Sequence, residues 1–434
     1  MRKRVSCLLV LSVAVTLFVS GLGAAKEVTL RVGMQASHAS VAGQEGNWLA
    51  DVIRDFRVAN PGISVEVEPV DGNYPQKMPT LIAAGVAPDV FQGWGDTQRS
   101  WAESGWLLDL EPYLNRLFPN AARDFFPAQW NALKLTHGPL AGMRYAIPMY
   151  VNVMGGMLYN AGMFDNAGLV YPENMKTWTW TELVSVAKKL TRISDGSHDH
   201  WGFLTLTDNT PWVDAWMWGA GGGLFAPEND RVFTGDTPES IAGLSFLHSL
   251  IWEHGVTPAN PWDGSLGGPQ KAFLSEKTAM MQTYSVWTQE VYSTAGFDWN
   301  IAPNPAGPTG LRPAVTVTDS FSVYGQTKNP EEAVRLAMAL ASRKANLGRL
   351  RAPFYQMPSL PSLGSEYYKL MPNKNLWVFL QSMDQARVDS RVFFAKPMEM
   401  NALFTQTWTK VLVGNETTPT VGMHSIAEAI RSLL

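Results

Sequence analysis

The sequence predicts an α/β protein whose sheets lie in two separate lobes. Patterns typical of strands alternate with patterns typical of helices from the first elements onward, which favours doubly wound, largely parallel sheets. About 409 of the 434 residues remain after a predicted leader segment, and this length exceeds what a single hydrophobic core ordinarily holds. Such sheets bind ligands beyond the carboxyl ends of their strands, so the loops that follow strands are where we expect functional residues.

The chain opens with a β-α-β pattern. Residues 28–32 alternate as a strand does, and residues 48–56 place apolar side chains one turn apart, as one face of a helix does. Asn60-Pro61-Gly62 ends that helix, and residues 63–67 alternate again. This pattern predicts two strands joined by a crossover helix at the start of the first lobe.

A second helix and a third strand follow. The helix begins after Pro75, and Pro79 within it is expected to kink or shorten it. Asp89-Val90-Phe91 is a short buried strand that leads into a loop at residues 93–96. Because residues 35–40 also follow a strand, we expect the two loops to share one functional edge of the sheet.

Three later helices carry start signals. Thr179 and Glu182 have the spacing of a capping box. The segments Thr237-Pro238-Glu239 and Asn329-Pro330-Glu331-Glu332 each place a proline at the start of a helix. Residues 303–313 are rich in proline and glycine, which indicates a surface connection or a crossover between lobes.

The first 25 residues have the pattern of a secretory signal peptide. Basic residues precede the short apolar run Leu8–Val19, and the small residues Gly23 and Ala25 stand before the expected cleavage site. The apolar run is too short to cross a bilayer comfortably, and an N-terminal membrane anchor is the alternative. The only cysteine, Cys7, lies in this segment, so we expect the mature chain to have no disulfide, no lipid anchor on Lys26 and no cysteine metal site. The mature protein is therefore expected to start near Lys26 and to be periplasmic or extracellular.

The mature chain is mildly acidic. Loss of the three basic residues at positions 2–4 takes the formal charge from −4 to −7, because residues 1–25 contain no acid. An acidic chain without a basic tract argues against a nucleic-acid partner. The glycine-rich run at 219–223 lacks the Lys-Ser/Thr of a phosphate-binding loop. His198-Asp199-His200 has no third ligand beside it, and we interpret it as a loop; we expect no metal and no cofactor.

A series of segments stands in a characteristic order along the chain. The series comprises Phe56–Gly62 (FRVANPG), Asp71–Lys77 (DGNYPQK), Leu81–Trp94 (LIAAGVAPDVFQGW), Ser104–Leu114 (SGWLLDLEPYL), Tyr145–Asn160 (YAIPMYVNVMGGMLYN), Trp178–Leu183, Ala272–Met281 (AFLSEKTAMM), Ile301–Pro308 (IAPNPAGP) and Thr327–Ala333 (TKNPEEA). Together they resemble the bacterial family of extracellular solute-binding proteins that includes maltose-binding protein. Each segment alone is weak, and their order over nearly the whole mature chain makes the resemblance specific.

The resemblance implies a two-lobe periplasmic-binding-protein fold of type II with a hinge between the lobes. The expected division is a signal peptide at 1–25, lobe I at 26–147 with 306–350, and lobe II at 148–305 with 351–434. The expected chain crossings at the hinge are Pro148–Asn152, the segment near Trp299–Pro305, and Leu350–Pro358. The resemblance also implies a monomeric, non-enzymatic receptor that closes on a solute and delivers it to the membrane permease of an ABC importer.

A sugar or oligosaccharide is the expected solute. Sugars present flat apolar faces, which aromatic rings fit, and a rim of hydroxyl groups, which carboxylates, amides and arginine fit through charge-assisted hydrogen bonds. In the family, the regions that carry such residues here commonly face the cleft. The candidates in these regions are Trp94 and Asp96 on the first lobe and Trp218, Tyr284 and Trp287 on the second. The alternative for each tryptophan is a packing role in the core.

Trp212, Trp216 and Trp218 precede the glycine-rich run. Side chains two residues apart point away from each other in a strand and in a helix, so we expect only one of Trp216 and Trp218 to meet the ligand. We choose Trp218 because it is nearer the glycines.

Four further residues are candidates with open alternatives. Asp319 stands where relatives often have a glycine-rich turn, and it either holds a ligand hydroxyl or caps a local turn. Tyr150 lies on the first crossing segment and either floors the cleft or packs in the hinge. Arg351 and Arg391 either face the ligand or form surface ion pairs.

Other functions stay open at this stage. Asp96 and Asp319 among aromatic residues leave a polyamine possible, whereas a polyol phosphate favours a basic cleft that the strand-end loops lack; a peptide is a further alternative. A secreted glycoside hydrolase also gathers tryptophans, but it needs two carboxylates at a defined separation, and no motif presents such a pair.

Overall fold

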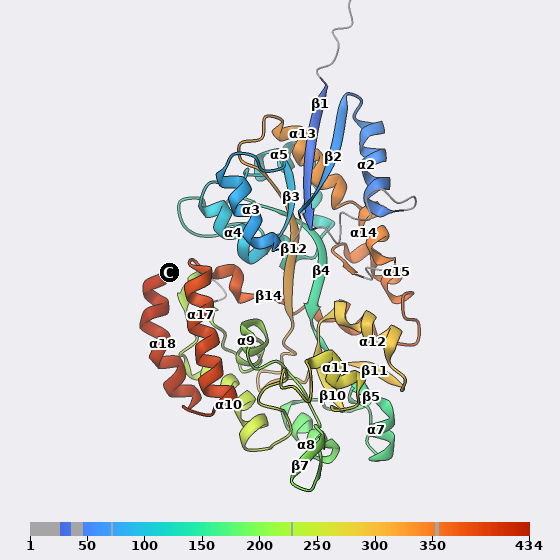
Figure 1. Ribbon diagram of the computed structural model, residues 1–434, viewed down its shortest axis with the longest axis vertical. Helices are drawn as coiled ribbons and strands as arrows, with labels where there is room; N and C mark the ends of the chain where they lie inside the picture. The colour runs from blue at the N-terminus through green and yellow to red at the C-terminus, as the bar shows by residue number, and fades with distance from the viewer. Residues whose placement is uncertain (1–26, 36–46, 71–72, 227–228, 352–355) are drawn as a thin grey trace, which may run out of the picture.

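The protein consists of two α/β lobes stacked along its longest axis (Figure 1). The computed structural model describes residues 27–35, 47–70, 73–226, 229–351 and 356–434. The predicted signal peptide and most of the loop at 35–40 lie outside these described residues. No helix in the described part of the chain is both long and apolar enough to span a membrane.

The first lobe is built on the larger sheet. Its elements are β1 (Val28–Gln35), α2 (Trp48–Ala59), β2 (Ile63–Val70), α3 (Tyr74–Ala83), β3 (Val90–Trp94), α4 (Gly95–Glu103), α5 (Glu111–Leu117), η1 (Ala121–Arg123), α6 (Pro127–Ala132), β4 (Ile147–Met154), β12 (Val315–Val323), α13 (Pro330–Leu340), α14 (Arg343–Leu350) and β13 (Met357–Pro358). The strand order is β13-β4-β12-β3-β1-β2, and β14 pairs with the other end of β12. The strands β1, β2 and β3 run parallel, as predicted, whereas β12 runs antiparallel to both β3 and β4.

The first helix shows why the predicted β-α-β unit forms. The Asn47 side chain accepts a hydrogen bond from the Leu49 amide and caps α2. Trp48, Leu49, Val52 and Phe56 form its buried face, which packs with β1 and with α13 in one hydrophobic cluster. The helix therefore covers the sheet because its apolar residues recur one turn apart.

The second lobe has a small antiparallel sheet in the order β10-β5-β11 with helices around it. Its elements are β5 (Gly156–Asn160), α7 (Ala161–Asn166), η2 (Pro172–Asn174), α8 (Trp180–Leu190), β6 (Arg192–Ser194), β7 (Ser197–His200), α9 (Thr210–Gly219), β8 (Phe225–Ala226), β9 (Asn229–Phe233), α10 (Pro238–Trp252), α11 (Pro269–Leu274), β10 (Met280–Thr283), η3 (Ser285–Trp287), α12 (Thr288–Thr294), β11 (Trp299–Pro303), η4 (Pro361–Leu363), α15 (Gly364–Tyr368), α16 (Trp377–Ser382), β14 (Arg387–Val388), η5 (Ser390–Phe393), α17 (Pro397–Trp408), η6 (Thr409–Val413) and α18 (Pro419–Leu433). The largest hydrophobic cluster of the molecule fills this lobe and is rich in aromatic side chains.

The strands β4 and β12 run through the middle of the molecule and connect the two lobes (Figure 1). We call this pair the hinge ribbon. The register between them shifts next to Asp319, where Ser320 pairs with Pro148 and Asp319 with Tyr150. The strand β12 also changes its second neighbour here, because Val315 and Thr316 pair with β14 whereas Asp319 to Val323 pair with β3. The ribbon thus passes from one lobe to the other at the irregularity.

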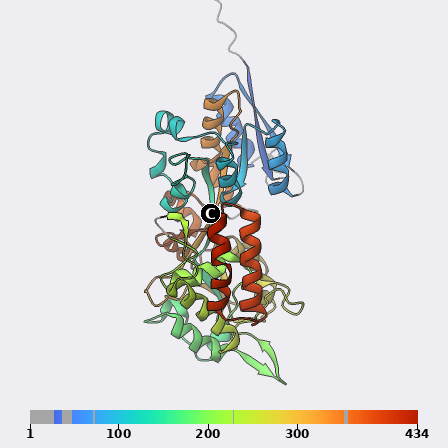
Figure 2. The same cartoon turned by 90° about the vertical axis from the view of Figure 1, so that its left-hand side faces the viewer.

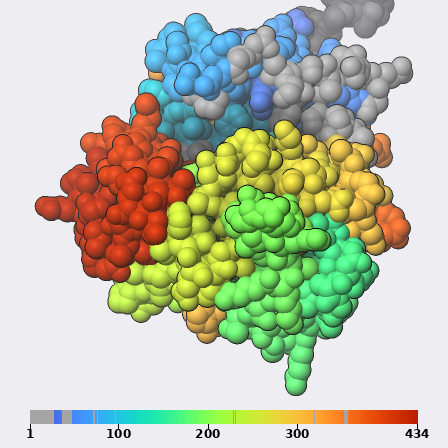
Figure 3. Space-filling model, turned by 60° about the horizontal axis from the view of Figure 1, so that its bottom comes forward, coloured from blue at the N-terminus to red at the C-terminus, as the bar shows by residue number. Residues whose placement is uncertain are grey.

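The C-terminal helices bring the second lobe against the first. α17 and α18 stand side by side along one flank of the second lobe, below the first lobe (Figure 2). The helix α4 of the first lobe contacts η5 and α17, and its Glu103 forms an ion pair with Arg231 of β9. Figure 3 shows the second lobe from below, with its C-terminal part in red beside its yellow-green part. The lobes therefore meet beside the hinge ribbon through α4 of the first lobe and η5, α17 and β9 of the second.

Several predicted elements are confirmed. The capping box at Thr179 and Glu182 starts α8, and the Thr237 side chain caps α10. Pro79 lies inside α3, which nevertheless continues to Ala83.

Two segments that we expected to be loops are instead parts of regular secondary structure. β3 ends at Trp94 and α4 begins at Gly95, so no loop separates them. His198-Asp199-His200 belongs to the hairpin of β6 and β7 rather than to a loop.

Residues 306–313 contact the second lobe, since Ala306 pairs with Thr179 and the Thr309 hydroxyl donates a hydrogen bond to the Gly219 carbonyl. The lobe boundaries stay a proposal, and these contacts favour a second crossing within β12.

Candidate functional site

The two faces of the hinge ribbon carry different side chains. Alternation along β4 and β12 puts Tyr150, Asn152 and Met154 on the same face as their partners Asp319, Val317 and Val315. We call this the cleft face. The other face, which we call the rear face, carries Thr316, whose hydroxyl oxygen is 3.4 Å from the Gln129 Nε2 of α6. α6 therefore covers the rear face and leaves the cleft face to other partners.

Three aromatic residues of the second lobe cover the lower part of the cleft face. We call Trp212, Tyr284 and Trp287 the aromatic cluster. The Trp212 ring stacks on Trp287 with centroids 5.5 Å apart and meets the edge of Tyr284 at 5.3 Å. Trp212 and Tyr284 pack on Met154 and Val315 of the ribbon. The cluster combines the start of α9 with the turn after β10, so two distant segments build one aromatic surface.

A polar row lies above the aromatic cluster on the same face. Trp94, Asp319 and Tyr150 are direct neighbours across β3, β12 and β4. The Tyr150 hydroxyl donates a hydrogen bond to the Asp319 carboxylate, and burial together with that charge raises the pKa of Tyr150 well above its usual value. Asp319 is 2% exposed. Its carboxylate is thus held by a neighbour rather than by solvent.

A buried arginine lies behind Tyr150. The Arg349 Nη2 donates to the Met149 carbonyl at 2.6 Å, and its Nη1 donates to the Leu340 carbonyl at 3.1 Å. Burial lowers the pKa of Arg349 to about 9, and the Trp48 ring lies 4.6 Å from the guanidinium. These contacts fix the ribbon at the level of the polar row.

Two more polar groups border the aromatic cluster. The Oδ1 atom of Asn152 is buried on the cleft face and has no hydrogen-bond partner among the described residues. The Asp389 carboxylate accepts hydrogen bonds from Nε and Nη2 of Arg391. Burial raises the pKa of Tyr284, and the charges of Asp389 and Arg391 also act on it. A buried acceptor without a donor is costly, so Asn152 favours a ligand that brings a hydroxyl or amine proton.

The structure brings five of the eight predicted site residues to this region. Trp94, Tyr150 and Asp319 form the polar row, and Tyr284 and Trp287 belong to the aromatic cluster. Asp96 is the second residue of α4, and its side chain lies outside what the structure describes.

The other two predicted residues lie apart. Trp218 is buried near the end of α9, and among described residues its ring shows no contact with the aromatic cluster; the Arg387 guanidinium lies 4.5 Å above it instead. Because α9 is a helix, Trp212 reaches the ribbon while Trp218 points elsewhere. Arg351 is exposed just after α14 and makes no ion pair within the described chain.

Sequence reasoning noted Trp212 without choosing it as a site residue, and it missed Asn152 and Asp389. Pro211 in the first turn of α9 is the local signal that Trp212 stands at a helix start, the place where a chain leaves a loop. Asn152 and Asp389 have no local signal, since only the pairing of β12 with β4 and β14 brings them to the cleft face.

The arrangement suits a flat, hydroxyl-rich molecule. An aromatic surface lies below a row of carboxylate, phenol and amide groups, which is the combination that small-molecule pockets use for orientation and specificity. No group of three or more potential ligands for a metal ion occurs within the described residues.

A sequence model of bacterial extracellular solute-binding proteins matches residues 42–347. The chain belongs to this family. A protein of Brucella abortus (strain 2308), named as a binding protein, is 25% identical to this family member over 367 residues, which cover 80% of this chain and 81% of the relative.

Two solved structures share the fold of this solute-binding protein. An ABC substrate-binding protein from Listeria monocytogenes in complex with cycloalternan superposes with a TM-score of 0.74 at 21% identity, covering 94% of this chain and 99% of that one. A cyclo/maltodextrin-binding protein complexed with maltotetraose superposes with a TM-score of 0.75 at 18% identity, covering 94% and 98%. The predicted two-lobe periplasmic-binding-protein fold is confirmed.

Proposed function

We propose that this protein is the extracytoplasmic receptor of an ABC importer and that it captures a sugar or oligosaccharide between its lobes. The aromatic cluster supports this proposal most directly, because it lies on the same ribbon face as Asp319, Tyr150 and the unpartnered Asn152 oxygen. Apolar sugar faces fit the rings, and sugar hydroxyls both donate to carboxylates and accept from phenols. The complexes of both solved relatives contain oligosaccharides, which agrees with this ligand class.

Capture then works by closure of the hinge. The polar row belongs to the ribbon and the first lobe, whereas the aromatic cluster belongs to the second lobe. A ligand that contacts both groups binds the closed arrangement more tightly than the open one, and this difference in affinity drives closure. A monomer is sufficient for this mechanism, and the permease distinguishes the loaded receptor by its shape.

The ligand class is tested by a screen on the purified mature chain. Neutral mono- and oligosaccharides, polyamines, polyol phosphates and short peptides are compared by thermal shift, and each hit is titrated by calorimetry. We expect one-to-one binding of a neutral sugar or oligosaccharide, because Arg391 pairs with Asp389 and Tyr150 hydrogen-bonds to Asp319, which leaves no strong demand for a charged ligand. Binding of polyamines alone, with no sugar response, contradicts the proposed class.

Whether the bound sugar stays intact distinguishes a receptor from a glycoside hydrolase. A hydrolase needs one carboxyl group as acid and a second carboxylate as base or nucleophile on either side of the scissile bond. Asp389 accepts three hydrogen bonds from the Arg391 guanidinium, which disfavours either role for it. Prolonged incubation with the bound oligosaccharide should leave it intact by chromatography, and product formation contradicts the receptor proposal.

Export is part of the same proposal. We infer cleavage of residues 1–25 on the basis of the basic start, the apolar run and the small residues at 23 and 25. The intact mass of the protein recovered from outside the cytoplasm should correspond to a chain that starts at Lys26. A mass that retains the first 25 residues contradicts cleavage.

A further inference from the structure

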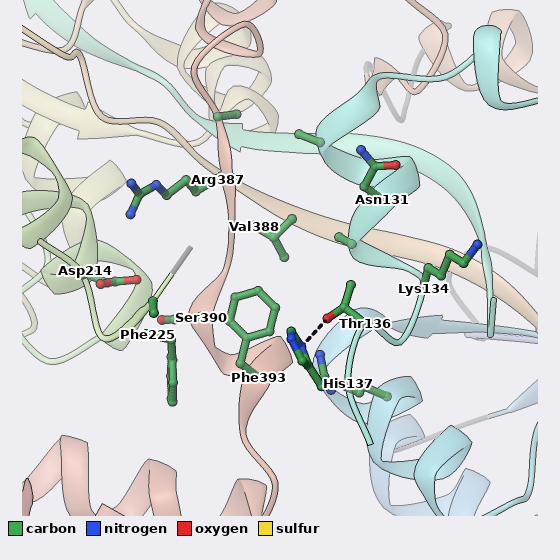
Figure 4. Close-up of a pocket in the computed structure, with 16 residues that line it drawn as sticks. Asn131, Lys134, Thr136, His137, Asp214, Phe225, Arg387, Val388, Ser390 and Phe393 are labelled. Carbon is green, nitrogen blue, oxygen red and sulfur yellow. Dashed lines mark hydrogen bonds between the residues drawn. The ribbon is translucent and has the colours of Figure 1, made fainter. Parts of the chain in front are cut away.

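A cavity, which we call the rear cavity, lies around β14 at the edge of the hinge ribbon and reaches α6 on the rear face. Its volume is about 320 Å³, and residues from both lobes line it. The first lobe contributes Arg99 of α4 together with α6 and the loop that follows α6, and the second lobe contributes Asp214, Phe225 and the segment from Ala386 to Phe393. Figure 4 shows Arg387 and Asp214 on one side of the opening, Lys134 and His137 on the other, and Phe393 between them.

This rear cavity is distinct from the candidate sugar site. Ala128, Asn131 and Ala132 of α6 line it, and α6 covers the rear face of the ribbon through Gln129. The aromatic cluster packs on the opposite face, against Met154 and Val315. None of the residues of the aromatic cluster or the polar row lines the rear cavity.

Arg387 is the residue that gives this cavity a chemical preference. Its Nη1 donates to the Gly222 carbonyl at 3.2 Å, and its guanidinium lies 4.5 Å from the Trp218 ring. Within the described chain, no carboxylate forms an ion pair with it. Burial lowers the pKa of Arg387, and the carboxylate of Asp214, which forms no ion pair with it, offsets this effect only in part. A partly buried cation without an ion-pair partner is an attractive place for an anion.

The other charged groups of the cavity are already engaged. Lys134 pairs with Glu111 at 3.1 Å, and Arg99 pairs with Glu103 at 3.2 Å. Asp214, the only acid in the lining, turns its Oδ1 to the Leu224 amide at 2.8 Å. An incoming anion can therefore approach Arg387 without breaking an ion pair of the described chain.

The rest of the lining is apolar and aromatic. The Phe393 ring is in edge contact with Phe225 at 6.0 Å, and the Arg99 guanidinium lies 5.6 Å from the same Phe393 ring. Ala128, Ala132 and Val388 add aliphatic surface. A ring that enters beside Phe393 gains stacking and apolar contact while a charged substituent reaches Arg387.

We propose that the rear cavity is a second binding site, separate from the sugar cleft, for a small organic anion that combines an aromatic ring with a carboxylate or sulfonate. The anionic group pairs with Arg387, and the ring lies against Phe393. The lining of this cavity shares no residue with the polar row or the aromatic cluster, so the test of this site does not depend on the proposed sugar specificity.

The test uses a matched pair of fluorescent probes on the mature protein. 1-Anilinonaphthalene-8-sulfonate carries the ring system and a sulfonate, whereas N-phenyl-1-naphthylamine carries the same rings without charge. We expect saturable one-to-one binding of the sulfonate and at least about tenfold weaker binding of the neutral probe, because only the sulfonate forms a charge-assisted hydrogen bond. Arg387→Gln should weaken the sulfonate about tenfold and leave the neutral probe unchanged.

Controls assign the binding to this cavity. Arg123→Gln removes the same charge from an exposed position of the first lobe, and Trp287→Ala alters the cleft face; both should bind the sulfonate as the parent does. Arg387→Lys keeps the charge and should retain most of the affinity, which separates loss of charge from loss of folding. The proposal is overturned if Arg387→Gln binds the sulfonate normally, if Trp287→Ala loses it, or if no saturable binding occurs.

Discussion

Trp287 is the residue through which we propose that the aromatic cluster binds a ligand. It is partly exposed and stacks on the fully buried Trp212, so one side of its ring is supported while the remainder is open to a ligand. Trp287→Ala should weaken sugar binding by about 1–3 kcal/mol through lost apolar contact and stacking. Calorimetric titration with the sugar found in the screen measures the loss.

The control for this change is another partly exposed tryptophan. Trp252 lies at the end of α10, and its indole N–H donates to the Leu412 carbonyl, outside the cleft face. Trp252→Ala should leave sugar affinity unchanged. If Trp287→Ala binds sugar normally and only its melting temperature falls, the residue serves packing and the site assignment fails.

Asp214 provides a pH-dependent prediction at the same scale. Burial raises the pKa of Asp214 from 3.8 to about 6, so between these pH values the native protein holds a proton that the unfolded chain has lost. The contribution of this group to the free energy of unfolding therefore falls by up to about 3 kcal/mol as pH rises from 4 to 6, and it stays constant above pH 6. Asp214→Asn should remove this slope and raise stability at pH 7.5, as urea unfolding at both ends of the range measures.

An exposed acid is the matched control for Asp214. Glu428 lies on the exposed side of α18, and Glu428→Gln should leave the difference in stability between pH 4.5 and pH 7.5 as it is in the parent. A parent-like pH dependence in Asp214→Asn contradicts the assigned cause.

At the scale of single elements, the start of α8 tests whether the capping residues seen in the sequence stabilise the helix. Glu182 accepts the Thr179 amide at 3.0 Å, which completes the capping box that the sequence indicates. Thr179→Ala should lower the free energy of unfolding by about 1 kcal/mol. Thr181→Ala, at an exposed position in the first turn, is the control. Equal losses in the two variants contradict a capping role.

Elements differ in how well the sequence predicts them, and the reason is the range of the interactions involved. The helices α2, α8 and α10 follow from capping residues and apolar spacing, which act within a few residues. Local signals cannot decide between Trp212 and Trp218, because that choice depends on how α9 packs against the hinge ribbon. Asn152 and Asp319 meet only through pairing of strands more than 150 residues apart. The fold class and the residue types of the site were thus predictable, whereas the membership of the site needed the tertiary structure.

At the scale of the whole molecule, the account rests on motion between two rigid lobes. The hinge ribbon changes neighbours next to Asp319, where the polar row lies, and the aromatic cluster packs on the part of the ribbon that enters the second lobe. The rear cavity and the Glu103–Arg231 ion pair also join parts of both lobes. The only cysteine, Cys7, lies in the predicted signal peptide, so cysteines introduced at chosen positions of the mature chain are labelled without interference.

The most direct test measures the distance between the lobes. Spin labels are attached to Arg57→Cys on α2 and Lys188→Cys on α8, both exposed and at opposite ends of the molecule (Figure 1). A second pair within the first lobe, Arg57→Cys with Asn115→Cys, is the control. On saturation with the sugar found in the screen, the inter-lobe distance should shorten while the distance within the first lobe stays constant. An inter-lobe distance that is the same with and without bound sugar contradicts capture by hinge closure.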